Sequence, residues 1–439
     1  MFLYPNDLYD ELIHEYSKVK NQKFNTLPDV PEKDLFQIFV DTAFHASFLT
    51  EEGRRIGFRI MYIPDEIAFK NKQNNIIFQN RIRFIPFEKK RIYSVSEVNK
   101  ISPVVEYKRY ILCVSPNITR KKELFIIGLL DVGDNWWKFV HHETSGGMPP
   151  PNNYTVTCLK PGELSISSNG RIILVLRNGQ IEKPSNNALW EGPINDFLKI
   201  AREEFYKEVL KSINKKTYGK EDHDYPYFFY NTFLERLLFS IREKMHGGTI
   251  IILPHDINKN DTRLTDRINI KYSCNYNYAW DTLISYLKTH WEYYDLHFSL
   301  WDNKQTITTE KFQKHSILNS HLEEISDSIS DLVNAIASMS SIDGAVVLND
   351  HFEVIGFGAE VLAVSPSLVN VKVYAKNGRM KSIPIESYGT RHRSAFRFCS
   401  SFDNAIAFIV SQDGAVKAVK RVGSDVIIWT DINNGSLGI

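Results

Sequence analysis

Two short motifs near the C-terminus carry the residue types that bind nucleotides. Asp343-Gly344-Ala345 opens an apolar run, and Gly389-Thr390-Arg391-His392-Arg393 precedes a segment with helical periodicity. Small residues let the backbone come close to a sugar or a base. A carboxylate can accept a hydrogen bond from a ribose hydroxyl or bind a divalent cation. Together the two motifs predict a nucleotide pocket.

The basic motif supplies groups that hold phosphate. Arginine makes planar, bidentate contacts to phosphate that lysine cannot copy. A helix over 393–402 would add free N–H groups and the positive end of its dipole. Alone, such a motif is typical of a solvated basic turn. Asp343-Gly344-Ala345 upstream and Ser411, at the end of a second apolar run, favour a phosphate site instead.

These residues, in this order, resemble the DisA-type diadenylate cyclases. The resemblance covers residues 321–431, with Gly358-Ala359-Glu360-Val361 as the strand end of the family pattern and Ser411 as its serine. It implies the activity of that family, in which two modules face each other and each holds one ATP. The two ATP molecules condense to cyclic di-AMP and release two pyrophosphates.

The resemblance also implies a role for each residue of the pattern. Catalysis would fall to Asp343, Arg391, His392 and Arg393. The nucleotide would be bound by Gly344, Ala345, Gly358, Val361, Gly389, Thr390 and Ser411. Asp343 and Asp413 would hold Mg²⁺ or Mn²⁺. The family's acidic residue usually follows the serine directly, whereas Gln412 intervenes here.

A second departure from the family pattern lies between the two motifs. The segment 365–388 is longer than the family requires and predicts an extra hairpin, Val371–Tyr374 and Met380–Ile385. Such an insert would alter how two modules approach each other or would gate the pocket. Both departures from the family pattern favour slow or switched-off catalysis.

Two other classes of function fit the same residues. The pocket could bind ATP or a cyclic dinucleotide without turning it over, which would make the protein a sensor. It could also belong to an enzyme that makes another linear or cyclic oligonucleotide. The sequence alone leaves both alternatives open.

Length, composition and charge limit the classes of protein to which this chain can belong. The chain has 439 residues, 43% of them hydrophobic, which is enough for two or three domains. With 53 basic and 52 acidic residues, the net charge of +1 argues against a general nucleic-acid or membrane-surface binder. No signal peptide or long apolar run is found, and the four cysteines are scattered. We therefore expect free thiols and a cytoplasmic protein whose partners are ATP and a second copy of itself.

Periodicity divides the chain into an N-terminal α+β region and a C-terminal α/β module. Helices are predicted over 8–19, 32–48, 194–212, 228–244 and 279–294, and strands over 56–63, 111–115, 124–130, 172–176 and 249–253. We expect a region at 1–300, with an internal break near 185–195, a linker at 301–320 and a module at 321–439 with a mixed sheet and flanking helices. Residues 1–300 resemble the soluble sensor regions fused upstream of some cyclase modules.

Three weaker features remain in the sequence. Ile241–Pro254 and Ile336–Leu348 both run from a helix through small residues into an apolar strand, by duplication or by chance. His246-Gly247-Gly248, inside the first of these segments, is interpreted as a helix C-cap rather than a phosphate loop. His141-His142-Glu143 is interpreted as a loop rather than a metal site, because neighbours on a strand point to opposite faces.

Overall fold

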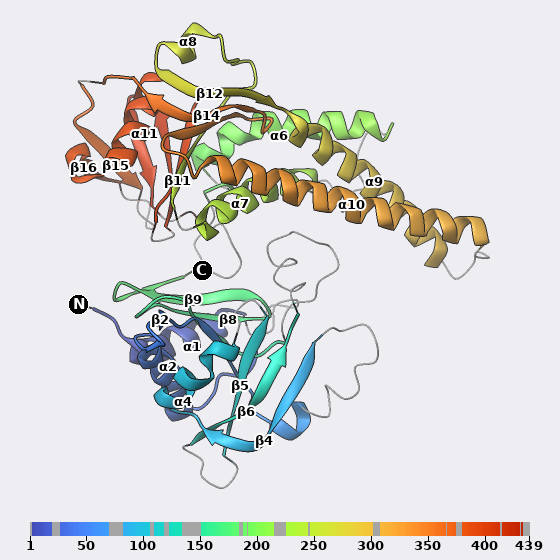
Figure 1. Ribbon diagram of the computed structural model, residues 1–439, viewed down its shortest axis with the longest axis vertical. Coiled ribbons are helices and arrows are strands. Elements are labelled where there is room, and N and C mark those ends of the chain that lie inside the picture. Colours follow the sequence, from blue (N-terminus) through green and yellow to red (C-terminus); the bar gives the residue numbers. More distant parts are fainter. Residues whose placement is uncertain are drawn as a thin grey trace. The chain divides into compact units, whose positions relative to one another are not determined.

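The structure is a computed structural model. It describes residues 2–19, 27–69, 82–105, 109–117, 123–133, 151–183, 188–190, 192–214, 225–244, 246–301, 308–365, 367–374, 380–412, 415–430 and 432. The chain divides into two compact units, the first ending at Pro184 and the second covering Ser185–Asn434. Each unit has its own sheet and its own core, and each is described separately here (Figure 1).

Within the described ranges, the first unit is built on an eight-stranded mixed sheet with the order β10-β9-β8-β7-β3-β5-β6-β4. Its strands are β3 (Phe58–Tyr62), β4 (Arg83–Ile92), β5 (Tyr110–Pro116), β6 (Leu124–Asp131), β7 (Thr155–Cys158), β8 (Leu164–Ser168), β9 (Arg171–Arg177) and β10 (Gln180–Glu182). A separate short pair is formed by β1 (Thr50–Glu51) and β2 (Arg54–Arg55). The helices are α1 (Leu8–Val19), α2 (Lys33–Ala46) and α4 (Val95–Ile101).

The core of the first unit lies where these helices cover one face of the sheet. Phe36, Phe39 and Val40 of α2 are fully buried and pack in one cluster with Phe58 and Ile60 of β3. The apolar residues recur three and four apart on α2 and two apart on β3, so each element turns a single apolar face to the other. The helices and strands predicted by periodicity in this unit are therefore found close to their expected bounds.

The second unit is also α/β, with a nine-stranded mixed sheet in its described part, ordered β12-β14-β13-β11-β17-β18-β19-β15-β16. Its strands are β11 (Gly248–Leu253), β12 (Ile268–Tyr276), β13 (Ala345–Asn349), β14 (Val354–Val361), β15 (Asn370–Tyr374), β16 (Met380–Pro384), β17 (Ile406–Val410), β18 (Val416–Val422) and β19 (Asp425–Trp429). Its helices are α6 (Gly192–Ser212), α7 (Tyr225–Glu243), α8 (Thr262–Thr265), α9 (Tyr278–Trp301), α10 (Thr309–Met339) and α11 (Thr390–Ser401).

Both faces of this sheet are buried, which explains the unbroken apolar runs of its central strands. Along β11, Ile250 and Ile252 join the core under α6, α7, α9 and α10. Ile251 and Leu253 join a second core on the opposite face, under α11. Full burial of each such side chain contributes ~1.5–3 kcal/mol, so both faces contribute to the stability of the unit.

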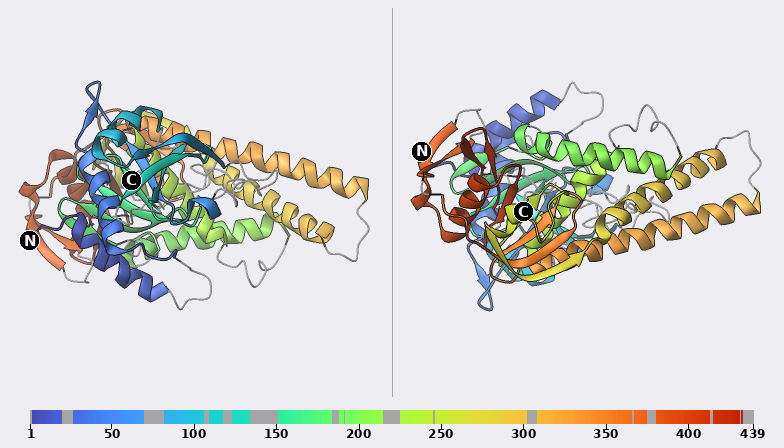
Figure 2. Two further views of the ribbon diagram at one scale, coloured as in Figure 1. Left: turned by 90° about the horizontal axis from the view of Figure 1, so that it is seen from below. Right: turned by 90° about the horizontal axis from the view of Figure 1, so that it is seen from above.

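Helices α9 and α10 run side by side and extend beyond the sheet (Figures 1 and 2). Helix α10 begins at Thr308, whose side chain accepts a hydrogen bond from the Lys311 N–H at 3.3 Å. Ile329, Val333 and Ile336 of α10 are buried in the helix-covered core. The long helix is anchored in the same core as β11 and ends at Met339, four positions before Asp343.

In the described part of the expected linker at 301–320, residues 309–320 are helical, and the expected module boundary at 321 falls inside the same helix. Strand β11 pairs in parallel with β13 and antiparallel with β17, so it lies in the middle of the C-terminal sheet. Residues from 309 onwards already belong to α10. A central strand that is buried on both faces pairs with a neighbour on each edge. The two neighbours of β11, β13 and β17, both come from the C-terminal part of the sequence. The unit boundary therefore falls at 184/185, close to the break expected near 185–195.

The insert at 365–388 does form the expected hairpin. Strands β15 and β16 pair antiparallel, and β15 adds in parallel to β19 at one edge of the sheet. Strands β14 and β12 lie at the opposite edge. The hairpin thus extends the sheet at the edge away from β12.

The echo between Ile241–Pro254 and Ile336–Leu348 has a counterpart in space. Each segment contains the end of a helix, α7 or α10, and a strand, β11 or β13. The two strands pair in parallel, with Thr249 opposite Ala345. The same helix-to-strand arrangement therefore occurs twice, side by side.

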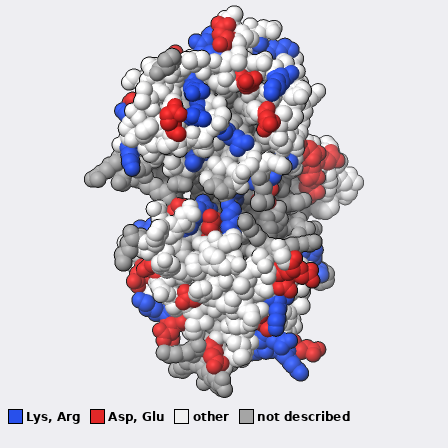
Figure 3. Space-filling model, turned by 60° about the vertical axis from the view of Figure 1, so that its left-hand side comes forward, with Lys and Arg blue, Asp and Glu red and all other residues white. Residues whose placement is uncertain are grey.

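The described helices include none with the length and apolar character needed to cross a membrane. Basic and acidic side chains are interspersed over the face drawn in Figure 3.

Candidate nucleotide-binding site

A cavity of about 430 Å³ opens on the α11 side of the C-terminal sheet. Ligand pockets typically measure about 300–1,000 Å³, so the cavity has the size of a small-molecule site. Strands β11 to β14 supply one wall and the first turns of α11 supply the other. The lining consists of Thr249, Ile251, Lys271, Asp343, Gly344, Ala345, Ala359, Glu360, Val361, Thr390, Arg391, Ser394 and Ala395.

Gly344 sets the position of the Asp343-Gly344-Ala345 turn. Its φ is +118°, and a Cβ at this position would lie 2.5 Å from the carbonyl carbon of Gly358 and 2.7 Å from the nitrogen of Ala359. Only glycine fits both the backbone angle and this approach. The start of β13 is thereby held against β14, with Asp343 exposed at the cavity.

The strand β14 bends where it meets the cavity. Gly358 has a φ of +63°, and a Cβ there would lie 3.0 Å from the ring of Tyr272 on β12. Beyond this bend, Ala359, Glu360 and Val361 line the cavity, while Gly358 itself does not. The backbone angle of Gly358 therefore sets the course of the three residues after it, which end at Val361 and line the cavity.

One side of the first turns of α11 faces the cavity. Gly389 is the N-cap, and Thr390, Arg391, Ser394 and Ala395 all line the cavity. Residues three or four apart share a helix face, which explains why these four residues line the same cavity. The N–H groups of the first turn have no partner within the helix, and the helix dipole adds positive charge there. The arrangement favours an anionic ligand group.

The turn before β11 lies beside Arg391. Gly247 has a φ of +65°, and a Cβ there would lie 2.7 Å from Nη1 of Arg391 and 2.7 Å from the carbonyl oxygen of Val410. Helix α7 ends earlier, at Glu243, so Gly247 is not its C-cap residue as the sequence suggested. The turn instead provides room for the guanidinium group.

His392 and Arg393 lie away from the described lining. Nε2 of His392 is 3.3 Å from Nζ of Lys417, and the His392 ring lies 5.5 Å from that of Tyr388. Nη1 of Arg393 forms an ion pair with Oε2 of Glu386 at 2.9 Å. Of the four residues expected to be catalytic, the structure therefore brings together Asp343 and Arg391.

Ser411 and Asp413, expected to bind nucleotide and metal, are not among the described residues that line the cavity. The Ser411 N–H donates a hydrogen bond to the carbonyl oxygen of Ala415 at 2.9 Å and closes the turn between β17 and β18, outside the cavity lining. Asp413, expected to bind a metal ion, lies outside the described residues, as does His141-His142-Glu143.

Four charged residues are among those that line the cavity: Lys271, Asp343, Glu360 and Arg391. In the part of the chain that the structure describes, none of the four takes part in a side-chain hydrogen bond or ion pair. Their positions allow cations to contact phosphate and carboxylates to contact hydroxyls or a metal ion. Sequence reasoning missed Lys271 and assigned Glu360 no separate role, since only the sheet brings β12 and β14 to the motifs.

Thr249 adds a buried polar group to the wall of the cavity. Its side chain is 6% exposed and lines the cavity, and its hydroxyl has no hydrogen-bond partner among the described residues. A buried hydroxyl without a partner costs ~1–3 kcal/mol. A ligand that accepts or donates a hydrogen bond at this point would remove that cost.

The cavity also contains suitable ligands for Mg²⁺ or Mn²⁺. Both ions prefer oxygen ligands and are commonly held by one or two carboxylates together with phosphate oxygens. Asp343 and Glu360 are the two acidic residues among those that line the cavity. These two residues fit such an ion, with Asp343 in the role that the resemblance implies.

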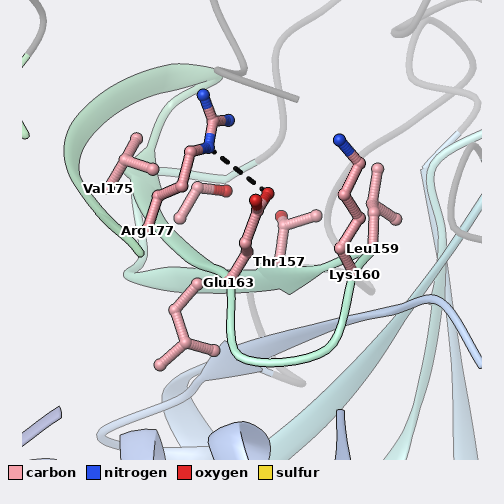
Figure 4. Close-up of a pocket in the computed structure, with 8 residues that line it drawn as sticks. Thr157, Leu159, Lys160, Glu163, Val175 and Arg177 are labelled. Carbon is pink, nitrogen blue, oxygen red and sulfur yellow. Dashed lines mark ion pairs between the residues drawn. The ribbon is translucent and has the colours of Figure 1, made fainter. Parts of the chain in front are cut away.

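The first unit has a much smaller pocket, on β7, β8 and β9 (Figure 4). Glu163 and Arg177 point toward each other across it, with Nε of Arg177 3.3 Å from Oε2 of Glu163. Its volume of about 30 Å³ suits a water molecule rather than a metabolite. This pocket therefore gives no indication of what the first unit binds.

Comparison with known proteins places a sensor region in the first unit. A family model described as "Probable sensor domain DACNV" matches residues 25–131, a range that includes α2, β3, β4, α4, β5 and β6. No curated protein and no solved structure matches the chain. The expectation of a sensor-like N-terminal region is confirmed for this range.

Proposed function

We propose that the second unit is a diadenylate cyclase module whose activity is controlled by the sensor region. It would condense two ATP into cyclic di-AMP and two pyrophosphates. The observation that carries the proposal is the single cavity that contains Asp343, Thr390 and Arg391. The matched sensor family, which is found in diadenylate cyclase-associated proteins, supports the same reading.

The lining suits the chemistry of this reaction. The 3′-hydroxyl of one ATP attacks the α-phosphate of the other. A new oxygen–phosphorus bond forms, the bond to the β-phosphate oxygen breaks, pyrophosphate leaves and the hydroxyl proton is lost. In-line transfer of this kind requires positioning and charge neutralisation more than covalent catalysis. Asp343 would orient the hydroxyl, and Arg391 with the first turn of α11 would hold the phosphates.

A bound Mg²⁺ or Mn²⁺ would neutralise phosphate oxygens. Asp343 would supply one ligand, and Glu360 is the other acidic residue of the lining. Gly344 and Ala345 would leave space for the nucleoside beside the backbone. Because cyclisation joins two nucleotides, we also propose that two modules associate during catalysis.

A second candidate function is nucleotide binding without turnover. Arg393 is paired with Glu386, and His392 contacts Lys417, so two of the expected catalytic residues contact other protein groups. A cavity that retained Asp343 and Arg391 alone could still hold a nucleotide or a cyclic dinucleotide. The protein would then be a nucleotide sensor rather than an enzyme.

One experiment separates these functions. The full chain is incubated with Mn²⁺ and each of the four nucleoside triphosphates, singly and mixed, and the products are resolved by chromatography. Cyclic di-AMP with pyrophosphate from ATP alone is the expected result. Tight ATP binding without a product would favour the sensor, and a different linear or cyclic product would favour another synthase.

A further inference from the structure

A second cluster of chemically active side chains lies at the other end of β11. His255 and His351 each follow, by two positions, the paired residues Leu253 of β11 and Asn349 of β13. Parallel neighbours end at the same edge of a sheet, so the two imidazoles meet there. Their rings are stacked, with centroids 4.3 Å apart.

A carboxylate from α6 completes the cluster. Oε2 of Glu204 lies 3.3 Å from Nε2 of His351 and 3.7 Å from Nε2 of His255. The candidate ligand atoms of the three residues all lie within 4.8 Å of one another. Both imidazoles thus present the same ring nitrogen to one carboxylate.

Neighbouring groups fix the orientation of each ring. Nδ1 of His255 lies 3.1 Å from Oδ1 of the buried Asp350, a carboxylate that can accept a hydrogen bond from this nitrogen and so orient the ring. The indole ring of Trp280 stacks on His351 with centroids 3.7 Å apart. A carboxylate behind a histidine is the usual outer partner of a metal-binding imidazole.

We propose that Glu204, His255 and His351 bind a divalent transition-metal ion of the Zn²⁺ class. Two neutral imidazoles and one carboxylate form a recognised set of three protein ligands for Zn²⁺, with water in the fourth position. Such an ion holds its ligands at ~2.0–2.2 Å, so the cluster would close by roughly an ångström on binding. Glu204 and His255 are each 38% exposed and have room for this movement.

The site is separate from the nucleotide cavity. Thr249 lines the cavity near the start of β11, whereas His255 follows the strand's last residue, Leu253. A strand of this length spans roughly 17–20 Å. The ion would therefore tie α6 to the ends of two central strands and stabilise the second unit. It would not take part in phosphate chemistry.

The test uses the full chain after removal of metal with a chelator. Co²⁺ binding is followed by visible absorption, and Zn²⁺ binding by competition and by the shift in Tm. The paired variant His255→Gln/His351→Gln is compared with His321→Gln, which changes an exposed histidine on α10. The wild type and His321→Gln should bind one more ion than the paired variant. Saturating Zn²⁺ should raise their Tm by ~5 °C through binding to the folded state alone.

Glu204→Gln provides a milder second variant, because it keeps the size of the side chain. It should weaken Zn²⁺ binding at least ~10-fold without altering the Tm of the metal-free protein, as expected for loss of one ligand. Equal ion stoichiometry and equal Tm shifts in the wild type and the paired variant would overturn the proposal. Neither readout involves a nucleotide, so the result is independent of the proposed cyclase activity.

Discussion

Asp343 and Arg391 line one cavity although they belong to separate motifs on separate elements. Asp343 lies two positions before the start of β13 at Ala345, and Arg391 lies in the first turn of α11. The carboxylate and the guanidinium are therefore available to the same ligand.

Thr249→Val tests whether the cavity accepts a polar ligand. The two side chains have nearly the same shape, and the substitution removes a buried hydroxyl that lacks a partner among the described residues. The free energy of unfolding of the ligand-free protein should stay unchanged or rise by ~1 kcal/mol. ATP affinity should fall. Calorimetric titration and denaturant unfolding measure the two effects, and unchanged affinity would argue against contact between Thr249 and the ligand.

Arg391 and Arg393 should differ in their effect on ATP binding. Arg391→Ala removes a cation from the cavity, whereas Arg393→Ala breaks an ion pair with Glu386 outside the lining. A charge-assisted hydrogen bond contributes ~1.5–3 kcal/mol, so Arg391→Ala should weaken ATP binding ~10- to 100-fold. Arg393→Ala serves as the matched control, with a smaller effect on binding by a single module. Equal losses in both variants would show that the phosphate site is not the one described.

Gly344→Ala should destabilise the second unit. The new Cβ would lie 2.5 Å from the carbonyl carbon of Gly358, at a φ of +118° that alanine rarely adopts. Such strain costs ~1–3 kcal/mol. At Gly389, by contrast, a Cβ would meet no atom within 4 Å and φ is negative, so Gly389→Ala should cost less. Thermal unfolding of the two variants compares these costs, and equal values would contradict the close approach of β13 to β14.

His290 on α9 should make stability depend on pH. Burial lowers the pKa of His290 to about 4, below the ordinary histidine value of ~6.5. The unfolded chain therefore binds a proton that the folded chain does not between these values. Stability is fully present above pH ~6.5 and falls by up to ~3 kcal/mol as pH drops toward 4.

His290→Gln should remove this part of the pH dependence. His14→Gln, at an exposed position on α1, is the control and should keep it. Denaturant unfolding at pH 7.5 and pH 4.5 gives the comparison. An identical pH dependence in His290→Gln and the wild type would show that another group is responsible.

Local sequence patterns predicted the elements of both units well. The apolar residues of α2 and β3 recur with the period of each element. Gly344 was expected to leave room for a sugar or a base, whereas the structure shows that it permits the close approach of β14. Periodicity reports which side of an element is buried, but it does not report which element covers it. The membership of β11 in the C-terminal sheet was missed for that reason.

The same limit applies to the site. Lys271 reaches the cavity because β12 pairs with β14, and Gly247 reaches Arg391 because β11 lies next to β17. These are long-range pairings that leave no mark in the local sequence. Conversely, both arginines of the basic motif, Arg391 and Arg393, were expected to contact the same ligand. The helical turn of α11 directs Arg391 to the cavity and leaves Arg393 beside Glu386.

The most direct measurement of the central claim is cyclic di-AMP formation by the wild type and by Asp343→Asn. Asp327→Asn, at an exposed position on α10, is the matched control. Loss of one polar contact to the reacting groups should lower the rate by ~10²–10³ in Asp343→Asn, with Tm unchanged. Asp327→Asn should keep the wild-type rate. A wild-type rate in folded Asp343→Asn would contradict the assignment of this cavity.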